Sequence, residues 1–124
     1  MKKPIDTAGK VAGAPYSVAI DTGSTVYVSG QVPLDPATGK LVPGDIKAQT
    51  EQVFANLNSA LSAAGLSLAH VVKSTVFMTD LAEFGAMNEV YARQMPAPFP
   101  ARSTVQVAAL PLGAKVEIEV VAVR

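Results

Sequence analysis

The sequence contains no cysteine and a single histidine among its 124 residues. A chain without thiols forms no disulfides, binds no metal through thiolates and has no cysteine nucleophile. One histidine, His70, is too few for a histidine-based metal cluster. We therefore expect no metal site, and we expect His70 to be structural or to lie at the surface.

Net charge and long apolar runs are also lacking. Ten basic and ten acidic residues cancel, so no overall field attracts nucleic acid or an anionic membrane. No apolar run approaches the roughly 18 residues that span a bilayer, and residues 1–10 lack the apolar segment of a signal peptide. These absences predict a cytoplasmic protein with no nucleic-acid partner and no membrane partner.

What is present is an ordinary globular composition, with 49% hydrophobic and 16% charged residues. A chain of this length is expected to form one domain, residues 1–124, around one hydrophobic core. Low charge also permits a large face to be buried against copies of the same chain, so an oligomer is a reasonable expectation.

Stretches rich in β-branched residues predict five strands, at residues 17–21, 25–32, 71–79, 102–110 and 115–123. The turn residues at 21–24 join the first two strands as a hairpin. Residues 1–15 are expected to form an extended lead-in, because they mix proline and glycine with small residues.

Helical periodicity predicts two helices between these strands. Asp45 suits the N-cap of the first helix and Gly65 its C-terminal end, while Asp80 suits the cap of the second. The predicted buried stripe of the second helix is Leu81, Phe84, Asn88, Tyr91 and Met95, and Gln49, Gln52 and Asn56 fall largely off the stripe of the first. The order β-β-α-β-α-β-β predicts an α+β fold, a mixed sheet with both helices packed on one face. The other face must be solvated or buried by another subunit.

Arg102 is the most informative single residue. It follows a turn formed by Phe99, Pro100 and Ala101 and enters a predicted strand. Such an arginine is most often an exposed or interfacial ion-pair partner. The functional alternative is a planar fork that holds a small carboxylate through two hydrogen bonds.

Glu117 and Glu119 alternate with β-branched residues in the last predicted strand. A strand glutamate is commonly solvated, and the alternative is an acid/base that activates or orients water. If the last two strands form a simple hairpin, Arg102 and Glu117 lie on the order of 15 Å apart, at about 3.3 Å per residue. A shared site would then favour a cleft between subunits.

Three more polar residues are candidates. Asn88 falls on a predicted apolar stripe, where an unpaired amide costs about 1–3 kcal/mol, so it either bonds to nearby backbone or orients a site residue. Tyr16 and Ser29 either donate hydrogen bonds in a pocket or belong to a strand surface. No phosphate-binding loop and no Gly-x-Ser-x-Gly elbow is present, so phosphate binding and serine hydrolysis are unsupported.

At these residues the sequence resembles the RidA/YjgF family of reactive-intermediate deaminases. The resemblance covers nearly the whole chain and is carried by residues 14–16, 28–31, 72–77, 99–105 and 116–119. It implies a chorismate mutase-like fold, a single RidA-like domain over residues 1–124, and a homotrimer with sites in the clefts between subunits. It also implies cofactor-free hydrolysis of enamine and imine intermediates, such as 2-aminoacrylate and 2-iminobutanoate, to 2-oxo acids and ammonia.

The resemblance assigns roles to individual residues. Arg102 would grip the carboxylate of the substrate and Glu117 would position the attacking water. The remaining implied pocket residues are the side chains of Tyr16, Ser29 and Asn88 and the backbone at Gly30 and Thr104. An iminium carbon is already electrophilic, so a positioned water, a charge anchor and a proton acceptor suffice without a metal or cofactor.

Thr104 stands where many members of the family have cysteine, which puts any thiol-based activation in question for this chain. The alternative function is a module that binds small carboxylates such as 2-oxo acids, or acts like a chaperone, without turnover. The ribonuclease activity of some relatives has little support in a neutral chain without a basic stripe.

Overall fold

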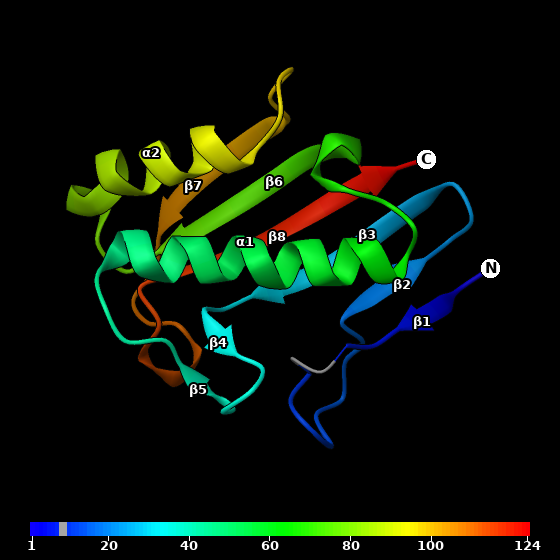
Figure 1. The fold of residues 1–124 in the computed structure, drawn as a ribbon, viewed down its shortest axis with the longest axis horizontal. Helices are drawn as coiled ribbons and strands as arrows, with labels where there is room; N and C mark the ends of the chain where they lie inside the picture. The colour runs from blue at the N-terminus through cyan, green and yellow to red at the C-terminus, as the bar shows by residue number, and fades with distance from the viewer. Residues whose placement is uncertain (8–9) are drawn as a thin grey trace.

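The computed structural model describes residues 1–7 and 10–124, and it shows a six-stranded mixed sheet with two long helices on one face (Figure 1). This confirms the predicted α+β fold, and the main elements follow the predicted order. Three short strands were not predicted, and one of them lies in the expected lead-in. Residues 8 and 9, also in the expected lead-in, lie outside the described residues.

The sheet has the strand order β1-β2-β3-β8-β6-β7. Its strands are β1 (Lys3–Ile5), β2 (Ala19–Asp21), β3 (Thr25–Gln31), β6 (Val71–Met78), β7 (Ala101–Gln106) and β8 (Val116–Val123). Strands β6 and β7 run parallel, and the other neighbours run antiparallel. A separate small ribbon pairs β4 (Leu34–Asp35) with β5 (Lys40–Leu41).

Helix α1 (Ile46–Ala63) begins and ends where the sequence predicts. The Asp45 carboxylate accepts a hydrogen bond from the Ala48 amide at 3.0 Å, and Gly65 follows the helix with a φ of 76°, which glycine adopts without strain. The prediction that Gln49 and Asn56 lie off the buried stripe is wrong, because both are buried. Each finds backbone partners: Gln49 accepts from the Lys115 amide, and Asn56 donates to two carbonyls of the 32–34 segment.

The second helix differs from its prediction. Asp80 caps a short 3-10 turn, Leu81–Glu83, and helix α2 (Phe84–Gln94) follows it. Of the predicted buried stripe, Tyr91 and Met95 are buried, whereas Leu81, which lies in the 3-10 turn, and Phe84, the first residue of α2, are exposed. Met87 and Val90 are buried as well. Tyr91 meets Phe54 of α1 edge to face, with ring centroids 5.7 Å apart.

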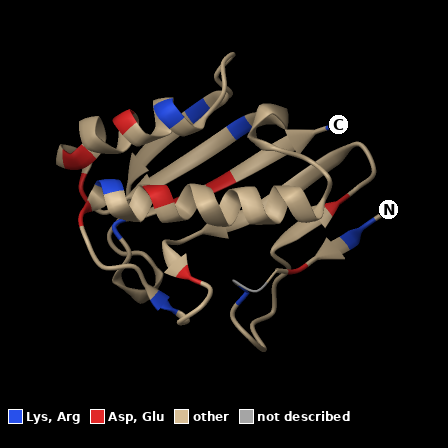
Figure 2. Ribbon diagram, in the orientation of Figure 1, with Lys and Arg blue, Asp and Glu red and all other residues tan. Residues whose placement is uncertain are grey.

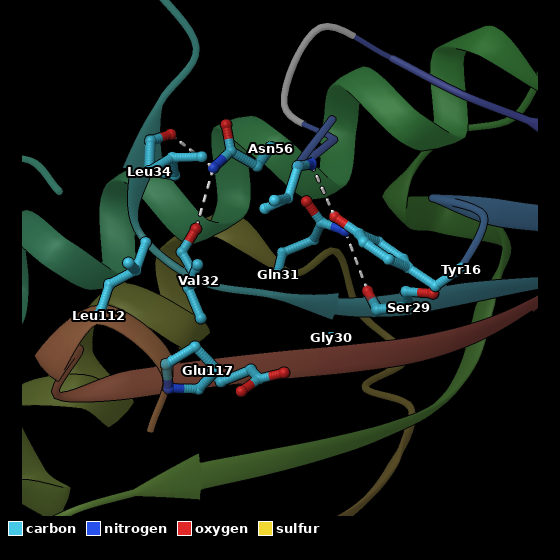
Figure 3. Close-up of a pocket in the computed structure, with 11 residues that line it drawn as sticks. Tyr16, Ser29, Gly30, Gln31, Val32, Leu34, Asn56, Leu112 and Glu117 are labelled. Atoms are coloured by element: carbon cyan, nitrogen blue, oxygen red, sulfur yellow. Dashed lines mark hydrogen bonds between the residues drawn. The ribbon is translucent and has the colours of Figure 1, made fainter. Parts of the chain in front are cut away.

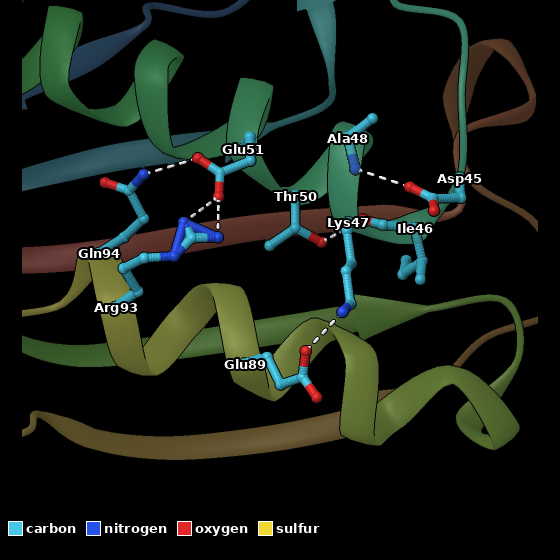
Figure 4. A network of polar contacts seen from close by, with 9 residues as sticks. All are labelled: Asp45, Ile46, Lys47, Ala48, Thr50, Glu51, Glu89, Arg93 and Gln94. Carbon is cyan, nitrogen blue, oxygen red and sulfur yellow. Dashed lines mark hydrogen bonds and ion pairs between the residues drawn. The ribbon is translucent and has the colours of Figure 1, made fainter.

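A polar network joins the outer surfaces of α1 and α2 (Figure 4). Lys47 pairs with Glu89, and Glu51 accepts from both Arg93 and Gln94. The ion-paired side chains are largely exposed, so each pair contributes at most about 1 kcal/mol. Figure 2 shows basic and acidic residues interspersed on both helices, with no stripe of one sign along their described residues.

The last two strands do not form the simple hairpin considered above. Strand β7 follows the crossover helix α2 and therefore pairs in parallel with β6 at the edge of the sheet. The chain then passes through a 3-10 turn, Pro111–Gly113, and returns as β8 on the other side of β6. Strand β6 thus separates Arg102 from Glu117.

Candidate functional site

Arg102 and Glu117 lie on opposite faces of the sheet. Arg102 is paired with Ser74 across β6 and β7, and Glu117 is paired with Phe77 across β6 and β8. Cross-strand partners share a face, whereas successive residues alternate. Ser74 is fully buried under the helices, where its hydroxyl lies 2.6 Å from the Tyr91 hydroxyl. Glu117 alternates with the buried Val116 and Ile118 and so faces away from the helices.

Glu117 lines a hollow of about 390 Å³ (Figure 3). Strands β3 and β8 supply Ser29, Gly30 and Glu117, and Tyr16 lies at one side. The full set of lining residues is Val11, Tyr16, Ser29, Gly30, Gln31, Val32, Leu34, Asn56, Pro111, Leu112 and Glu117. The structure therefore brings four of the predicted site residues into one hollow.

Gly30 is in direct contact with the Glu117 carboxyl group. A Cβ atom built on Gly30 would lie 2.0 Å from Glu117 Oε2 and 2.8 Å from Cδ, which no real side chain tolerates. The φ of Gly30 is not positive, so the backbone itself would accept other residues. The need for glycine here comes from the position of the carboxyl group.

Burial raises the pKa of the Glu117 carboxyl group above its ordinary value of 4.5, and the charge of Glu119 raises it further. Both causes disfavour the ionised form. A carboxyl group with raised proton affinity is a better proton acceptor than a fully solvated glutamate. The structure thus distinguishes the two glutamates of β8, because Glu117 is half-buried in the hollow and Glu119 is exposed.

We expect Glu117→Gln to raise the free energy of unfolding at pH 7. Because the folded pKa is raised, the folded state binds the proton more tightly than the unfolded state. Wild-type stability therefore falls as pH rises from 4.5 through the folded pKa. Since the side chain is half-exposed, the gain should stay below about 1 kcal/mol and vanish near pH 4. Urea unfolding of wild type and Glu117→Gln at pH 4 and pH 7 measures this gain in the free energy of unfolding. A Glu117→Gln variant that is less stable than wild type at pH 7 would contradict the expectation.

Tyr16 and Ser29 are held by the chain segment that precedes the hairpin. The Tyr16 hydroxyl accepts from the Val11 amide at 3.0 Å, and the Ser29 hydroxyl donates to the Ser17 carbonyl at 2.7 Å. The Tyr16 hydroxyl keeps its proton available for a ligand, and the Ser29 oxygen keeps its lone pairs.

Arg102 lines a second hollow, of about 440 Å³, together with Asn88, Tyr91, Ala92, Phe99 and Pro100. Its Nη1 donates to the Asn88 amide oxygen at 2.7 Å, and its guanidinium carbon lies 4.6 Å from the centroid of the Tyr91 ring. The amide of Asn88 thus bonds to an arginine rather than to backbone. Within residues 1–7 and 10–124 no carboxylate pairs with Arg102, so the rest of its planar fork can bind an anion.

No group of three metal-ligating side chains occurs among the described residues. No helix in that part of the chain is long and apolar enough to cross a bilayer. The polar side chains of the two hollows are a carboxyl group, hydroxyls, the amides of Gln31, Asn56 and Asn88, and a guanidinium group.

Comparison with known proteins decides the family. The model of the family described as Endoribonuclease L-PSP matches residues 7–124. The mouse protein named 2-iminobutanoate/2-iminopropanoate deaminase is 46% identical over 118 residues, which cover 95% of this chain and 87% of that protein. The chain belongs to the RidA/YjgF family.

Two crystal structures of RidA/YjgF proteins superpose closely on this chain. RidA from an Antarctic Psychrobacter is 47% identical with a TM-score of 0.93, covering 98% of this chain and 99% of that one. Escherichia coli TdcF with bound serine is 44% identical with a TM-score of 0.92, covering 99% of each chain. The fold and the family predicted from the sequence are both confirmed.

Thr104, at the position where many RidA/YjgF proteins have cysteine, lines neither hollow. It is paired with Val76, on the helix-covered face. Its buried hydroxyl has no hydrogen-bond partner within the described part of the chain. The structure does not bring its side chain together with the other predicted site residues.

Sequence reasoning missed several residues of the hollows. The helical periodicity predicts Asn56 off the buried stripe, and Leu112 lies between the predicted strands 102–110 and 115–123, where the sequence indicates no site residue. Phe99 and Pro100 were used as markers of the Arg102 motif and not as walls of a pocket. The clustering of apolar residues next to turns was the signal available for these positions.

Proposed function

We propose that the protein is a hydrolytic deaminase that converts enamine and imine intermediates, of the 2-aminoacrylate and 2-iminobutanoate type, to 2-oxo acids and ammonia. The observation that carries the proposal is the half-buried Glu117 carboxyl group, which has a raised pKa and lines a hollow. The name of the mouse relative supports the reaction class, and the serine bound to TdcF supports a small ligand that bears a carboxylate.

The proposed chemistry needs one water and one proton acceptor. Glu117 accepts a proton from a water as the water oxygen bonds to C2 of the iminium, which breaks the carbon–nitrogen π bond. The proton then passes to nitrogen. As the resulting carbinolamine collapses, Glu117 accepts its hydroxyl proton, the 2-oxo group forms and the carbon–nitrogen bond breaks, so that ammonia leaves. Transfer of that proton to the departing ammonia, which becomes ammonium, returns Glu117 to its ionised starting state. Tyr16 would hydrogen-bond the substrate, as would Ser29 and the backbone at Gly30 and Thr104.

Arg102 would hold the substrate carboxylate bidentately, with Asn88 and the Tyr91 ring orienting its fork. Within one chain the sheet separates Arg102 from Glu117, so a shared site requires Arg102 of a partner subunit. We infer a homotrimer with sites between subunits. The sheet face that the helices leave uncovered supports an interface, because the exposed apolar side chains of Tyr27, Val105 and Val123 lie on it.

The same proposal covers the remaining expectations. Residues 1–124 would form one RidA-like domain that acts in the cytoplasm without a cofactor, a metal or a nucleic-acid partner. A 2-oxo acid binding module without turnover is the second candidate, because an unpaired arginine fork binds any small carboxylate.

A coupled assay tests the function. A serine dehydratase generates 2-aminoacrylate from serine, and the purified protein should accelerate the release of pyruvate and ammonia well above the uncatalysed rate. A thermal shift with 2-oxobutyrate but no acceleration would favour the binding module. Cleavage of RNA that is lost in Glu117→Gln would favour a ribonuclease instead.

A further inference from the structure

Large apolar side chains surround the mouth of the Glu117 hollow. Val11 is 52% exposed, Tyr16 37% and Leu112 64%, and all three line the hollow. Exposed apolar residues that converge on a concave site mark a surface that contacts a ligand or a partner. In Figure 3 Leu112 and Val32 lie on one side of the hollow and Tyr16 on the other, with Glu117 between them. We refer to Val11, Tyr16, Val32 and Leu112 as the apolar rim.

Leu112 is held in an unusual backbone conformation. Its φ and ψ are 63° and 13°, in the left-handed region that a leucine adopts only under constraint. Proline at position 111 and the left-handed Gly113 flank it. Glycine or asparagine would fit this backbone more easily. The turn instead presents an isobutyl group at the hollow, and strained positions of this kind gather at functional sites.

Val11 is placed across the hollow by its own anchor. Its amide donates to the Tyr16 hydroxyl at 3.0 Å, which ties this segment to the site. Lys10 next to it stacks on the Tyr16 ring and pairs with Asp6 at 3.6 Å, and it does not line the hollow. Among the described residues, Glu117 is thus the one carboxyl group that lines the hollow. Ser29, Gln31 and Asn56 add uncharged polar groups to the lining, and the apolar rim itself carries the Tyr16 hydroxyl.

In one chain the hollow is larger than a three-carbon imine, and the partner subunit that would bring Arg102 to the site would occupy part of it. Its volume of about 390 Å³ falls in the range of about 300–1,000 Å³ that is typical of sites for much larger ligands. In a 2-imino acid, C2 carries the carboxylate, the imine nitrogen and the side chain, which begins at C3. With C2 beside Glu117, the side chain is the group left to contact the rim. An apolar side chain placed there would displace water from the rim.

We propose that the apolar rim, with Leu112 as its main contact, makes this enzyme select 2-imino acids whose side chain is apolar and larger than methyl. The inference rests on the proposed deaminase function and names the substrate class of that same site. Leu112 acts here as a specificity-determining residue and takes no part in the chemical step.

The test compares kcat/KM for two imines. A D-amino-acid oxidase with catalase generates 2-iminopropanoate from D-alanine and 2-imino-4-methylpentanoate from D-leucine. Wild type should prefer the larger imine by about 10-fold or more, at the low end of the discrimination that methylenes provide in an apolar pocket. Leu112→Asn, which keeps the size and suits the left-handed backbone, and Leu112→Gly should both lower this preference about 10-fold. Leu81→Asn, an exposed leucine outside both hollows, should leave it unchanged.

The outcomes separate the two proposals. Equal kcat/KM values for both imines in wild type, or a preference unchanged in both Leu112 variants, would overturn the role of the rim while leaving the deaminase intact. Hydrolysis of neither imine by wild type would overturn both. Circular dichroism confirms that each variant is folded, and the two different substitutions guard against a failure of one of them to fold.

Discussion

Replacing Arg102 by alanine is expected to lower kcat/KM for 2-aminoacrylate hydrolysis by at least about 100-fold. A charge-assisted hydrogen bond contributes about 1.5–3 kcal/mol, and a bidentate fork forms two of them with the substrate carboxylate. Arg102→Lys should recover only a small part of the loss. A lysine ammonium group cannot form the planar fork that stacks on Tyr91 and bonds to Asn88.

The matched control is Arg93→Ala. Arg93 is an exposed arginine of α2 that pairs with Glu51 and lines neither hollow. Its loss should change the free energy of unfolding by no more than about 1 kcal/mol and leave kcat/KM unchanged. Full activity in Arg102→Ala would remove the carboxylate anchor from the mechanism.

Gly30→Ala is expected to reduce activity to a similar extent by displacing the Glu117 carboxyl group. The new Cβ atom would lie 2.0 Å from Glu117 Oε2, so the carboxyl group must rotate away or the strands must separate. Because small displacements of a catalytic group cost about 100-fold in rate, we expect at least this loss in kcat. Because the contacted atoms belong to the flexible, half-exposed side chain of Glu117, the effect on the free energy of unfolding should be smaller than the effect on kcat.

Gly85→Ala is the control for the effect of an added methyl group. A Cβ atom at Gly85 meets nothing within 4 Å, and the residue lies within helix α2. Alanine there should stabilise the protein by about 1 kcal/mol and leave kcat unaltered. A Gly30→Ala variant with wild-type kcat would show that Glu117 works from another position.

The fold was predictable where a local feature determined it. Asp45 and Gly65 bounded the first helix correctly because capping depends on neighbouring residues. The start of the second helix differs from the prediction because the same capping chemistry at Asp80 also serves a 3-10 turn, while Tyr91 and Met95 are buried as predicted. The burial of Gln49 and Asn56 could not be predicted, since their partners are backbone groups far along the chain.

The pairing of the last two strands could not be predicted either, because it depends on contacts with β6, which is distant in the sequence. Residues 102–124 alone suggested a hairpin, whereas the helical crossover makes β7 the parallel neighbour of β6. This arrangement puts the two charged residues on different faces of the sheet. The proposal of an intersubunit cleft therefore rests on the separation of Arg102 from Glu117 by β6, and not on spacing along a hairpin, which does not form.

The structure brings several of the predicted site residues together, but the sequence did not predict Gln31, Asn56 or the apolar walls of the hollows. Tyr16, Ser29, Gly30 and Glu117 share one hollow, and Arg102 contacts Asn88 in the other. The position of Leu112 next to a turn was its one signal, and its left-handed conformation could not be predicted, because that conformation is not expected of leucine. Thr104 was included through the family pattern, and its side chain lies apart from both hollows.

Subunit mixing tests most directly the claim that Arg102 and Glu117 serve one site from different subunits. Arg102→Ala and Glu117→Gln chains, each inactive alone, are co-expressed with different tags, and mixed assemblies are identified by native mass spectrometry. With random 1:1 mixing, about a quarter of the sites of a cyclic trimer receive both intact residues, so deaminase activity should return to about a quarter of the wild-type value. Mixed assemblies that remain as inactive as either parent would contradict a site shared between subunits.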